Sequence, residues 1–196
     1  MVRILEEMEI YAKENHVPIM MKDGIDFLTD YIKKNHIKTI LEIGTAIGYS
    51  SCKMALVDSN IKITTIERSP EMYDLALKNI SSLNLENQIE VIFDDALNVE
   101  LKDKYDLIFI DAAKAQYIKF FEKFKRNLKE NGVIVSDNLN FHGLVHSKKP
   151  IESRNVRGLV RKLNDYIVFL KENKEFETTF FDLGDGVSIS KKVKEL

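Results

Sequence analysis

Residues 38–52 read Lys-Thr-Ile-Leu-Glu-Ile-Gly-Thr-Ala-Ile-Gly-Tyr-Ser-Ser-Cys, and they are the segment most indicative of the fold class. The run 39–43 is mostly apolar and rich in β-branched residues, which predicts a buried strand that ends at Gly44. Gly48 lies four residues further on, and residues 49–57 can then form a helix. A strand, a glycine turn and a helix open a nucleotide-binding α/β unit, because glycines let the backbone approach a ligand and the helix N-terminus offers free N–H groups.

The spacing of this turn restricts the kind of nucleotide. Ala46 stands where the dinucleotide pattern G-x-G-x-x-G has its second glycine, and no Gly-Lys-Ser/Thr follows as it would in a P-loop. A Glu-x-Gly-x-x-x-Gly turn, with an acid at the end of the next strand, suits a nucleoside that lacks a pyrophosphate. S-adenosylmethionine is the leading candidate, and an ordinary glycine turn of an α/β protein is the alternative.

The composition is typical of an ordinary globular protein. The 196 residues predict one domain, 1–196, and a formal net charge of −2 provides no overall basic field for a nucleic acid. No apolar run approaches the roughly 18 residues of a membrane span. The single cysteine, Cys52, excludes an internal disulfide and is typical of a reducing compartment. We therefore expect a cytoplasmic protein.

Further along the chain, apolar runs alternate with helical patterns. Strands are expected at 39–43, 61–67, 89–95, 105–111 and 132–137, and helices at 2–14, 23–34 (capped by Asp23), 49–57, 70–83 and 116–129. This alternation predicts a doubly wound, mostly parallel α/β sheet with right-handed crossovers. The runs 176–183 and 187–192 are joined by Gly184-Asp185-Gly186, a spacing that predicts a C-terminal antiparallel hairpin.

An acidic residue ends each predicted strand after the first. In doubly wound sheets, ligands bind beyond the carboxyl ends of the strands, so these acids should gather at one edge. Glu67 lies 23 residues after Gly44, close to the distance at which a carboxylate binds ribose hydroxyls in nucleotide folds. Asp95 is placed to accept a hydrogen bond from the amino group of a purine. A lone Asp more often caps a helix or stabilises a turn, which is the alternative for each.

Asp111, Asp137 and Asn138 form a second group at the ends of the fourth and fifth strands. If these strands pair, two carboxylates and an amide oxygen converge, and such hard oxygen ligands favour Mg²⁺, Mn²⁺ or Ca²⁺ over zinc. Lys114 would lie at the same edge, where a cation and a sulfonium could lower its pKa enough for it to act as a base. The alternatives are a capping Asp with an Asx-turn, and a solvated surface lysine.

A basic segment follows the fifth strand. It contains Lys148, Lys149, Arg154, Arg157 and Arg161, the last three on one face of a predicted helix. The segment could contact the phosphates of an RNA stem-loop, or it could be an ordinary solvated helix face.

Together, the segments Leu41-Glu-Ile-Gly-Thr-Ala-Ile-Gly-Tyr-Ser50, Phe109-Ile-Asp-Ala-Ala-Lys114 and Ser136-Asp-Asn138 resemble the cation-dependent O-methyltransferases of the catechol and caffeoyl-CoA type. The likeness is strongest to the bacterial tRNA 5-hydroxyuridine methyltransferases. It implies a class I methyltransferase (Rossmann-like) fold with a seven-stranded sheet, and a homodimer. It also implies three sets of site residues. Those expected to bind S-adenosylmethionine are Met20, Gly44, Ser50, Glu67, Asp95, Ala96 and Asp111. Those expected to bind Mg²⁺ or Mn²⁺ are Asp111, Asp137 and Asn138, and those expected to act in catalysis are Lys114 and Asp111.

The resemblance implies methylation of 5-hydroxyuridine at the wobble position of the tRNA anticodon stem-loop, giving 5-methoxyuridine. In that base the 5-hydroxyl lies beside the 4-carbonyl, so it can chelate a metal as a catechol can. A small-molecule O-methyltransferase that acts on catechol-like acceptors is the first alternative. A non-catalytic nucleotide-binding module is the second, and the set of Asp111, Lys114, Asp137 and Asn138 argues against it.

Overall fold

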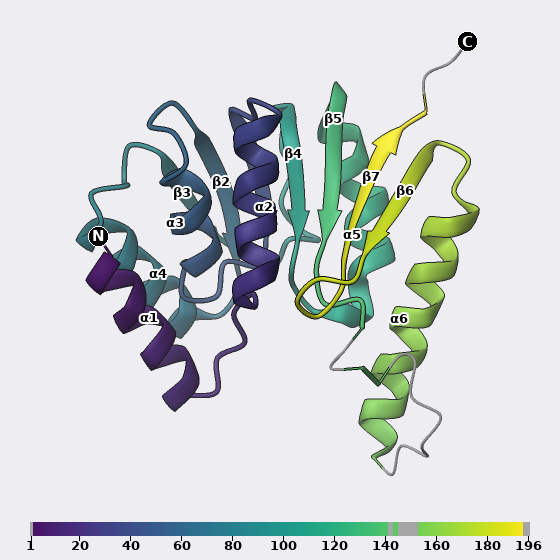
Figure 1. Ribbon diagram of the computed structural model, residues 1–196, viewed down its shortest axis with the longest axis horizontal. Coiled ribbons are helices and arrows are strands. Elements are labelled where there is room, and N and C mark those ends of the chain that lie inside the picture. Colours follow the sequence, from purple (N-terminus) through teal and green to yellow (C-terminus); the bar gives the residue numbers. More distant parts are fainter. Residues whose placement is uncertain (1, 141–142, 145–152, 194–196) are drawn as a thin grey trace.

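The computed structural model describes residues 2–140, 143–144 and 153–193, and these form one twisted sheet with helices on both faces (Figure 1). The seven strands of this described part are arranged in the order β3-β2-β1-β4-β5-β7-β6. Five of them pair in parallel, whereas β7 is antiparallel to both β5 and β6. The class I methyltransferase arrangement and the C-terminal antiparallel hairpin expected from the sequence are thereby confirmed.

The strands are β1 (Thr39–Ile43), β2 (Lys62–Glu67), β3 (Ile89–Phe93), β4 (Tyr105–Ile110), β5 (Leu128–Ser136), β6 (Phe176–Phe181) and β7 (Val187–Lys192). The α-helices are α1 (Val2–Glu14), α2 (Lys22–Lys34), α3 (Tyr49–Ala55), α4 (Pro70–Ser82), α5 (Tyr117–Phe124) and α6 (Arg154–Glu172). Short 3₁₀ turns at Lys114–Gln116 and Lys125–Asn127 flank α5. No helix in the described ranges is long and apolar enough to cross a membrane.

Side chains of β4 alternate between the two faces of the sheet, and each face has its own core. Leu107 and Phe109 pack with the residues of α1 to α4, while Ile108 and Ile110 pack with those of α5 and α6. Figure 1 shows α2 and α3 in front of the sheet and α5 behind it. Because both faces are covered, β4 is almost continuously apolar, as expected for a central parallel strand. Cys52, in α3, is completely buried in the first core.

The structure corrects several details of the sequence prediction. Asp23 does not cap α2: the cap residue is Met21, and the Asp23 carboxylate instead accepts hydrogen bonds from the N–H groups of Gly24 and Gly184. The third strand ends at Phe93, two residues before Asp95. The fifth strand begins at Leu128, so α5 is shorter than expected.

The strand order reverses direction beside β1. From β1 the chain proceeds to β2 and β3 on one side, and later returns to β4 and β5 on the other. At such a switch point the loops after two neighbouring strands diverge and leave a crevice beyond their carboxyl ends. Those ends point downward in Figure 1, toward the end of the molecule at which α6 begins.

Candidate functional site

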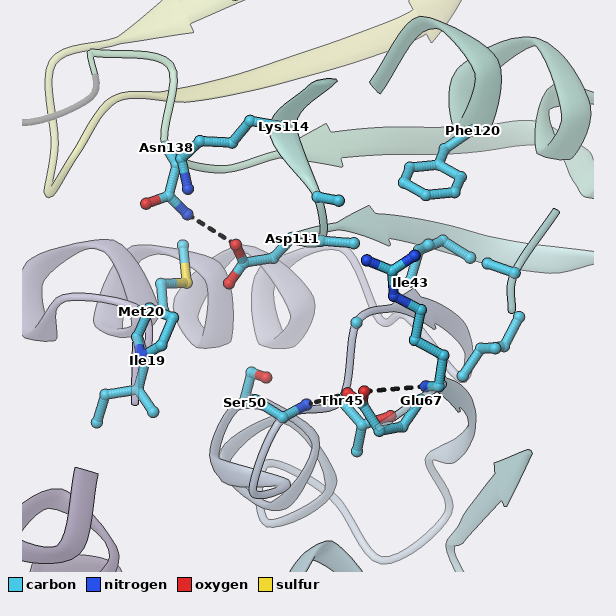
Figure 2. Close-up of a pocket in the computed structure, with 18 of the residues that line it drawn as sticks. Ile19, Met20, Ile43, Thr45, Ser50, Glu67, Asp111, Lys114, Phe120 and Asn138 are labelled. Carbon is cyan, nitrogen blue, oxygen red and sulfur yellow. Dashed lines mark hydrogen bonds between the residues drawn. The ribbon is translucent and has the colours of Figure 1, made fainter. Parts of the chain in front are cut away.

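A cavity of about 370 Å³ opens at this switch point (Figure 2). Its walls come from the segment 18–20 and from the residues that follow β1, β2, β3 and β4. The volume lies within the usual range of cofactor sites. The candidate cofactor residues all line this cavity: Met20, Gly44, Ser50, Glu67, Asp95, Ala96 and Asp111. Lys114 and Asn138 line it as well, whereas Asp137 is not among its lining residues.

The turn after β1 lies close to the end of β4. Gly44 has a φ of +99°, and a Cβ there would lie 2.3 Å from the carbonyl oxygen of Asp111, so only glycine fits. Ala46 also has a positive φ, of 46°, which is unusual for a residue with a side chain. Such conformations concentrate at ligand-binding sites. They shape the floor of the cavity here.

Glu67, the last residue of β2, is held by the backbone around it. Its Oε2 accepts a hydrogen bond from the N–H of Ala46 at 2.8 Å, and its Oε1 accepts from Arg68 at 2.9 Å and Ser69 at 2.8 Å. Three N–H donors fix the orientation of the carboxylate before any ligand arrives.

Asp95 is held from two sides. Its Oδ1 accepts from the N–H of Leu97 at 2.9 Å, and its Oδ2 accepts from the guanidinium of Arg68 at 3.2 Å. The hydrogen bond from Leu97 is the largest of the effects that lower the pKa of Asp95. Arg68 lines the same cavity, a contact that the sequence analysis did not predict.

Ser50 lines the cavity from α3, and Met20 lines it from the loop before α2. The hydroxyl of Ser50 donates to the carboxylate of Glu42 at 2.5 Å, while Figure 2 shows the Met20 sulfur facing Asp111. Glu42 is the penultimate residue of β1; it is fully buried and also accepts hydrogen bonds from Ser51 and Thr65. Burial raises the pKa of Glu42 to about 7.

The sequence prediction did not include Glu42. An acid inside a mostly apolar strand, three residues after the strand begins at Thr39, was the available signal. Such an acid needs buried donors, because an unpaired buried charge is very costly. The Ser50-Ser51 pair that follows the glycine turn supplies them.

Asp111, Asp137 and Asn138 converge as the strand pairing predicts. The amide Nδ2 of Asn138 donates to Asp111 Oδ1 at 2.7 Å and to Asp137 Oδ2 at 3.2 Å. Asn138 has a φ of +64°, a conformation that asparagine tolerates better than most residues, and this turns its side chain back toward both acids. The three side chains therefore surround one small space at the ends of β4 and β5.

The carboxylates of Asp111, which is partly exposed, and Asp137, which is buried, lie close together and repel each other. Burial raises the pKa of Asp111, which the charge of Lys114 partly offsets. Burial and the charge of Asp111 together raise the pKa of Asp137 to about 8. Within the described residues, the Asp137 Oδ1 atom is buried and accepts no hydrogen bond. Either a proton or a bound cation would relieve the repulsion between the two carboxylates.

Lys114 begins the 3₁₀ turn before α5, and its side chain extends toward Asn138 in Figure 2. Its amine is therefore at the edge that the sequence predicts. That Lys114 acts as a base remains a prediction.

Three of the five candidate RNA-binding residues are described. Arg154, Arg157 and Arg161 are exposed on the first turns of α6. That end of α6 lies at the same edge of the molecule as the carboxyl ends of the parallel strands (Figure 1). Lys148 and Lys149 lie outside the described residues.

The sequence matches the model of the O-methyltransferase family over residues 2–193. The chain belongs to this family. It is an O-methyltransferase that uses S-adenosylmethionine, and the resemblance seen in its motifs is confirmed at this level.

Several relatives of this methyltransferase are informative. It is 28% identical to the caffeoyl-CoA O-methyltransferase of Populus kitakamiensis, over 85% of this chain and 75% of the relative. It is 29% identical to tapetum-specific methyltransferase 1 of Arabidopsis thaliana, with the same coverage. A solved Staphylococcus aureus structure, described as a candidate caffeoyl-CoA O-methyltransferase, is 41% identical with a TM-score of 0.91, covering 96% of this chain and 92% of that one.

Proposed function

We propose that this methyltransferase transfers the methyl group of S-adenosylmethionine to one of two adjacent oxygens on an acceptor, with Mg²⁺ or Mn²⁺ as its cation. One observation carries the proposal: the carboxylates of Asp111 and Asp137 both contact the amide group of Asn138 beside the cofactor-sized cavity. Acceptors with vicinal oxygens can chelate a cation held by three protein ligands, because an octahedral ion keeps further positions for them.

Each cavity residue has a proposed role toward the cofactor. Glu67 would accept from the ribose hydroxyls, and its fixed carboxylate supports this role because little ordering remains to be done on binding. Asp95 and the adjacent Ala96 would contact the adenine. Met20, Ser50 and Asp111 would surround the methionine part, together with Gly44 in the cavity wall.

The residues present fit a hard divalent cation. Two carboxylates and one amide supply oxygen ligands of the type that Mg²⁺ and Mn²⁺ prefer, and the buried Asp137 Oδ1 lacks a hydrogen-bond donor in the described structure. The amide nitrogen of Asn138 now lies between the two acids. A cation bound there would favour the ionised form of an acceptor hydroxyl and orient it.

Lys114 is the proposed base. A phenol-like hydroxyl has an ordinary pKa of about 10, so it is a poor nucleophile until its proton is removed. The amine of Lys114, in its neutral form, would accept this proton. The acceptor oxygen then forms a bond to the methyl carbon as the carbon–sulfur bond breaks, and the sulfonium becomes a neutral thioether. Alignment of these three atoms would supply much of the rate.

Small catechol-like molecules are one class of acceptor. The relative from Populus kitakamiensis is named for caffeoyl-CoA, whose caffeoyl group is a catechol, and this supports the small-molecule alternative. The cavity would receive such a ring beside Lys114 and Asn138.

The wobble base of tRNA, 5-hydroxyuridine, is the second candidate acceptor, and one observation favours it. Arg154, Arg157 and Arg161 are all exposed on α6 at the edge where the cation ligands lie. Guanidinium groups on one helix face can contact successive phosphates of a stem-loop. Methyl transfer to the 5-hydroxyl group would convert 5-hydroxyuridine to 5-methoxyuridine.

One experiment tests the proposal and separates the acceptors. The purified protein is incubated with methyl-labelled S-adenosylmethionine, Mg²⁺, and either tRNA that carries 5-hydroxyuridine or a panel of catechols. We expect label in at least one vicinal-dioxygen acceptor and none in matched monophenols. If no acceptor of this kind is labelled while the cofactor still binds, the non-catalytic alternative replaces the proposal.

A further inference from the structure

The turn between β6 and β7 is attached to the loop that carries the cation ligands. The carbonyl oxygen of Asp185 accepts from the N–H of Asn140 at 2.7 Å, and that of Gly186 accepts from Leu139 at 3.0 Å. Two main-chain hydrogen bonds therefore fix residue 185 beside the segment that begins with Asp137 and Asn138.

The backbone at this contact leaves no spare room. Gly186 has a φ of +86°, and a Cβ there would lie 2.9 Å from both the backbone nitrogen and the side-chain Cγ of Asn140. Only glycine permits this approach. The close contact fixes the position of the preceding side chain, that of Asp185.

The side chain of Asp185 is buried, with only 5% of the residue exposed. Its charge acts on the candidate cation site, because it raises the pKa of both Asp111 and Asp137. It also contributes to the raised pKa of Tyr117, whose hydroxyl donates to the carbonyl oxygen of Asp137 at 3.2 Å. Asp185 is therefore a third acid near Asp111 and Asp137, and it comes from the C-terminal hairpin.

Asp185 is nevertheless outside the inner ligand set. In the described part of the chain, no three His, Cys, Asp or Glu side chains lie close enough together to hold one metal ion. In the proposed site, the inner ligands are the two acids at the strand ends and the amide of Asn138, without Asp185. A nearby acid that does not reach the ion can still attract it and can bind the water molecules around it.

We propose that Asp185 is a positioning residue of the cation site, which increases affinity for the divalent ion through its negative charge and through a hydrogen bond from an ion-bound water. This inference rests on the proposed function. It assigns to the Gly184-Asp185-Gly186 turn a role that its sequence pattern, typical of a hairpin, does not indicate.

The test measures cation affinity directly, in the absence of cofactor and acceptor. Binding of Mn²⁺ is titrated by electron paramagnetic resonance for the wild type, for Asp185→Asn and for Asp182→Asn. Asp182 is the matched control, since it is an exposed acid of the same hairpin that accepts from Asn140 Nδ2 at 3.0 Å. We expect Asp185→Asn to raise the Kd about tenfold or more, and Asp182→Asn to change it less than about twofold, as for an exposed charge screened by water.

Thermal melting with and without Mn²⁺ distinguishes positioning from a purely structural role. Our inference predicts that Mn²⁺ raises the Tm of Asp185→Asn less than that of the wild type. Equal Mn²⁺-dependent shifts and an unchanged Kd would overturn it, whatever happens to the Tm of the metal-free protein. If the Asn variant does not fold, Asp185→Ala makes the same charge change with a smaller side chain.

The controls also separate this inference from the proposed function. Asp137→Ala must abolish Mn²⁺ binding if the inner site is assigned correctly. Loss of binding in that variant, together with normal binding in Asp185→Asn, would overturn only the inference. Absence of Mn²⁺ binding in the wild type would overturn both.

Discussion

The main-chain N–H of Ala46 donates a 2.8 Å hydrogen bond to the carboxylate of Glu67, and so joins the turn after β1 to the end of β2. Ala46 reaches this position with a positive φ, in the place where dinucleotide-binding turns have a glycine. The turn that forms the floor of the cavity is therefore directly hydrogen-bonded to Glu67, the candidate residue for binding the ribose hydroxyls. A substitution at position 46 should therefore change the orientation of the Glu67 carboxylate, and a substitution of Glu67 should change the conformation of the turn.

Replacement of Glu67 should weaken cofactor binding. We expect Glu67→Ala to raise the Kd for S-adenosylhomocysteine by roughly 10–100-fold, because hydrogen bonds to a charged group contribute about 1.5–3 kcal/mol. Isothermal titration calorimetry measures this. Glu71→Ala, which removes an exposed acid nearby on α4, should have no effect. Unchanged affinity in Glu67→Ala would remove this residue from the site.

Chelation should abolish methyl transfer. EDTA removes the cation that we assign to Asp111, Asp137 and Asn138, and added Mg²⁺ or Mn²⁺ should restore the activity. Asp137→Ala should be inactive at every cation concentration, because it removes a ligand and not merely the ion. Full activity of the wild type in EDTA would exclude the chelate mechanism.

Cation affinity should depend on pH in a defined direction. The pKa of Asp137 is raised to about 8 without a cation, first by burial and then by the charge of Asp111. Protons therefore compete with the cation below that pH, and the Kd for Mn²⁺ should rise as the pH is lowered from 8 toward 6. A Mn²⁺ titration series over this range measures it. A Kd that is independent of pH would contradict the assignment of Asp137.

The buried acid in β1 should make stability pH-dependent. The pKa of Glu42 rises from its ordinary 4.5 to about 7 in the folded protein, so its stabilising contribution is complete below 4.5 and is lost as the pH rises through 7. The shift corresponds to a loss on the order of 3 kcal/mol. In urea unfolding at pH 4.5 and 8, Glu42→Gln should show less of this decline than the wild type. Parallel declines in both proteins would contradict it.

Replacement of the arginines of α6 should reduce methylation of tRNA and not of small acceptors. Replacement of Arg154, Arg157 and Arg161 by alanine should reduce methylation of tRNA and flatten its dependence on salt, because fewer phosphates are neutralised. Methylation of a small catechol should change little. The control replaces three exposed lysines near the opposite edge of the sheet, Lys33, Lys34 and Lys102, for the same change in charge. Equal losses with both acceptors would assign the arginines to the fold.

Local patterns were sufficient to predict the sheet and the meeting of Asp111 with Asp137. Both acids directly follow neighbouring parallel strands, and parallel pairing brings the carboxyl ends together. Features that depend on distant segments could not be predicted in this way. Asp185 reaches the site only because β7 inserts between β5 and β6. The expected Asp23 cap was wrong for a similar reason, since that carboxylate binds Gly184, 161 residues away.

Because Cys52 is buried, its reactivity can report local unfolding of α3. The chain has one thiol, it is completely inaccessible, and burial raises its pKa to about 12. An alkylating reagent can modify it only when α3 separates from the sheet. The rate of labelling therefore reports how often the helix next to the cavity detaches, and a bound cofactor should slow that rate in proportion to its occupancy.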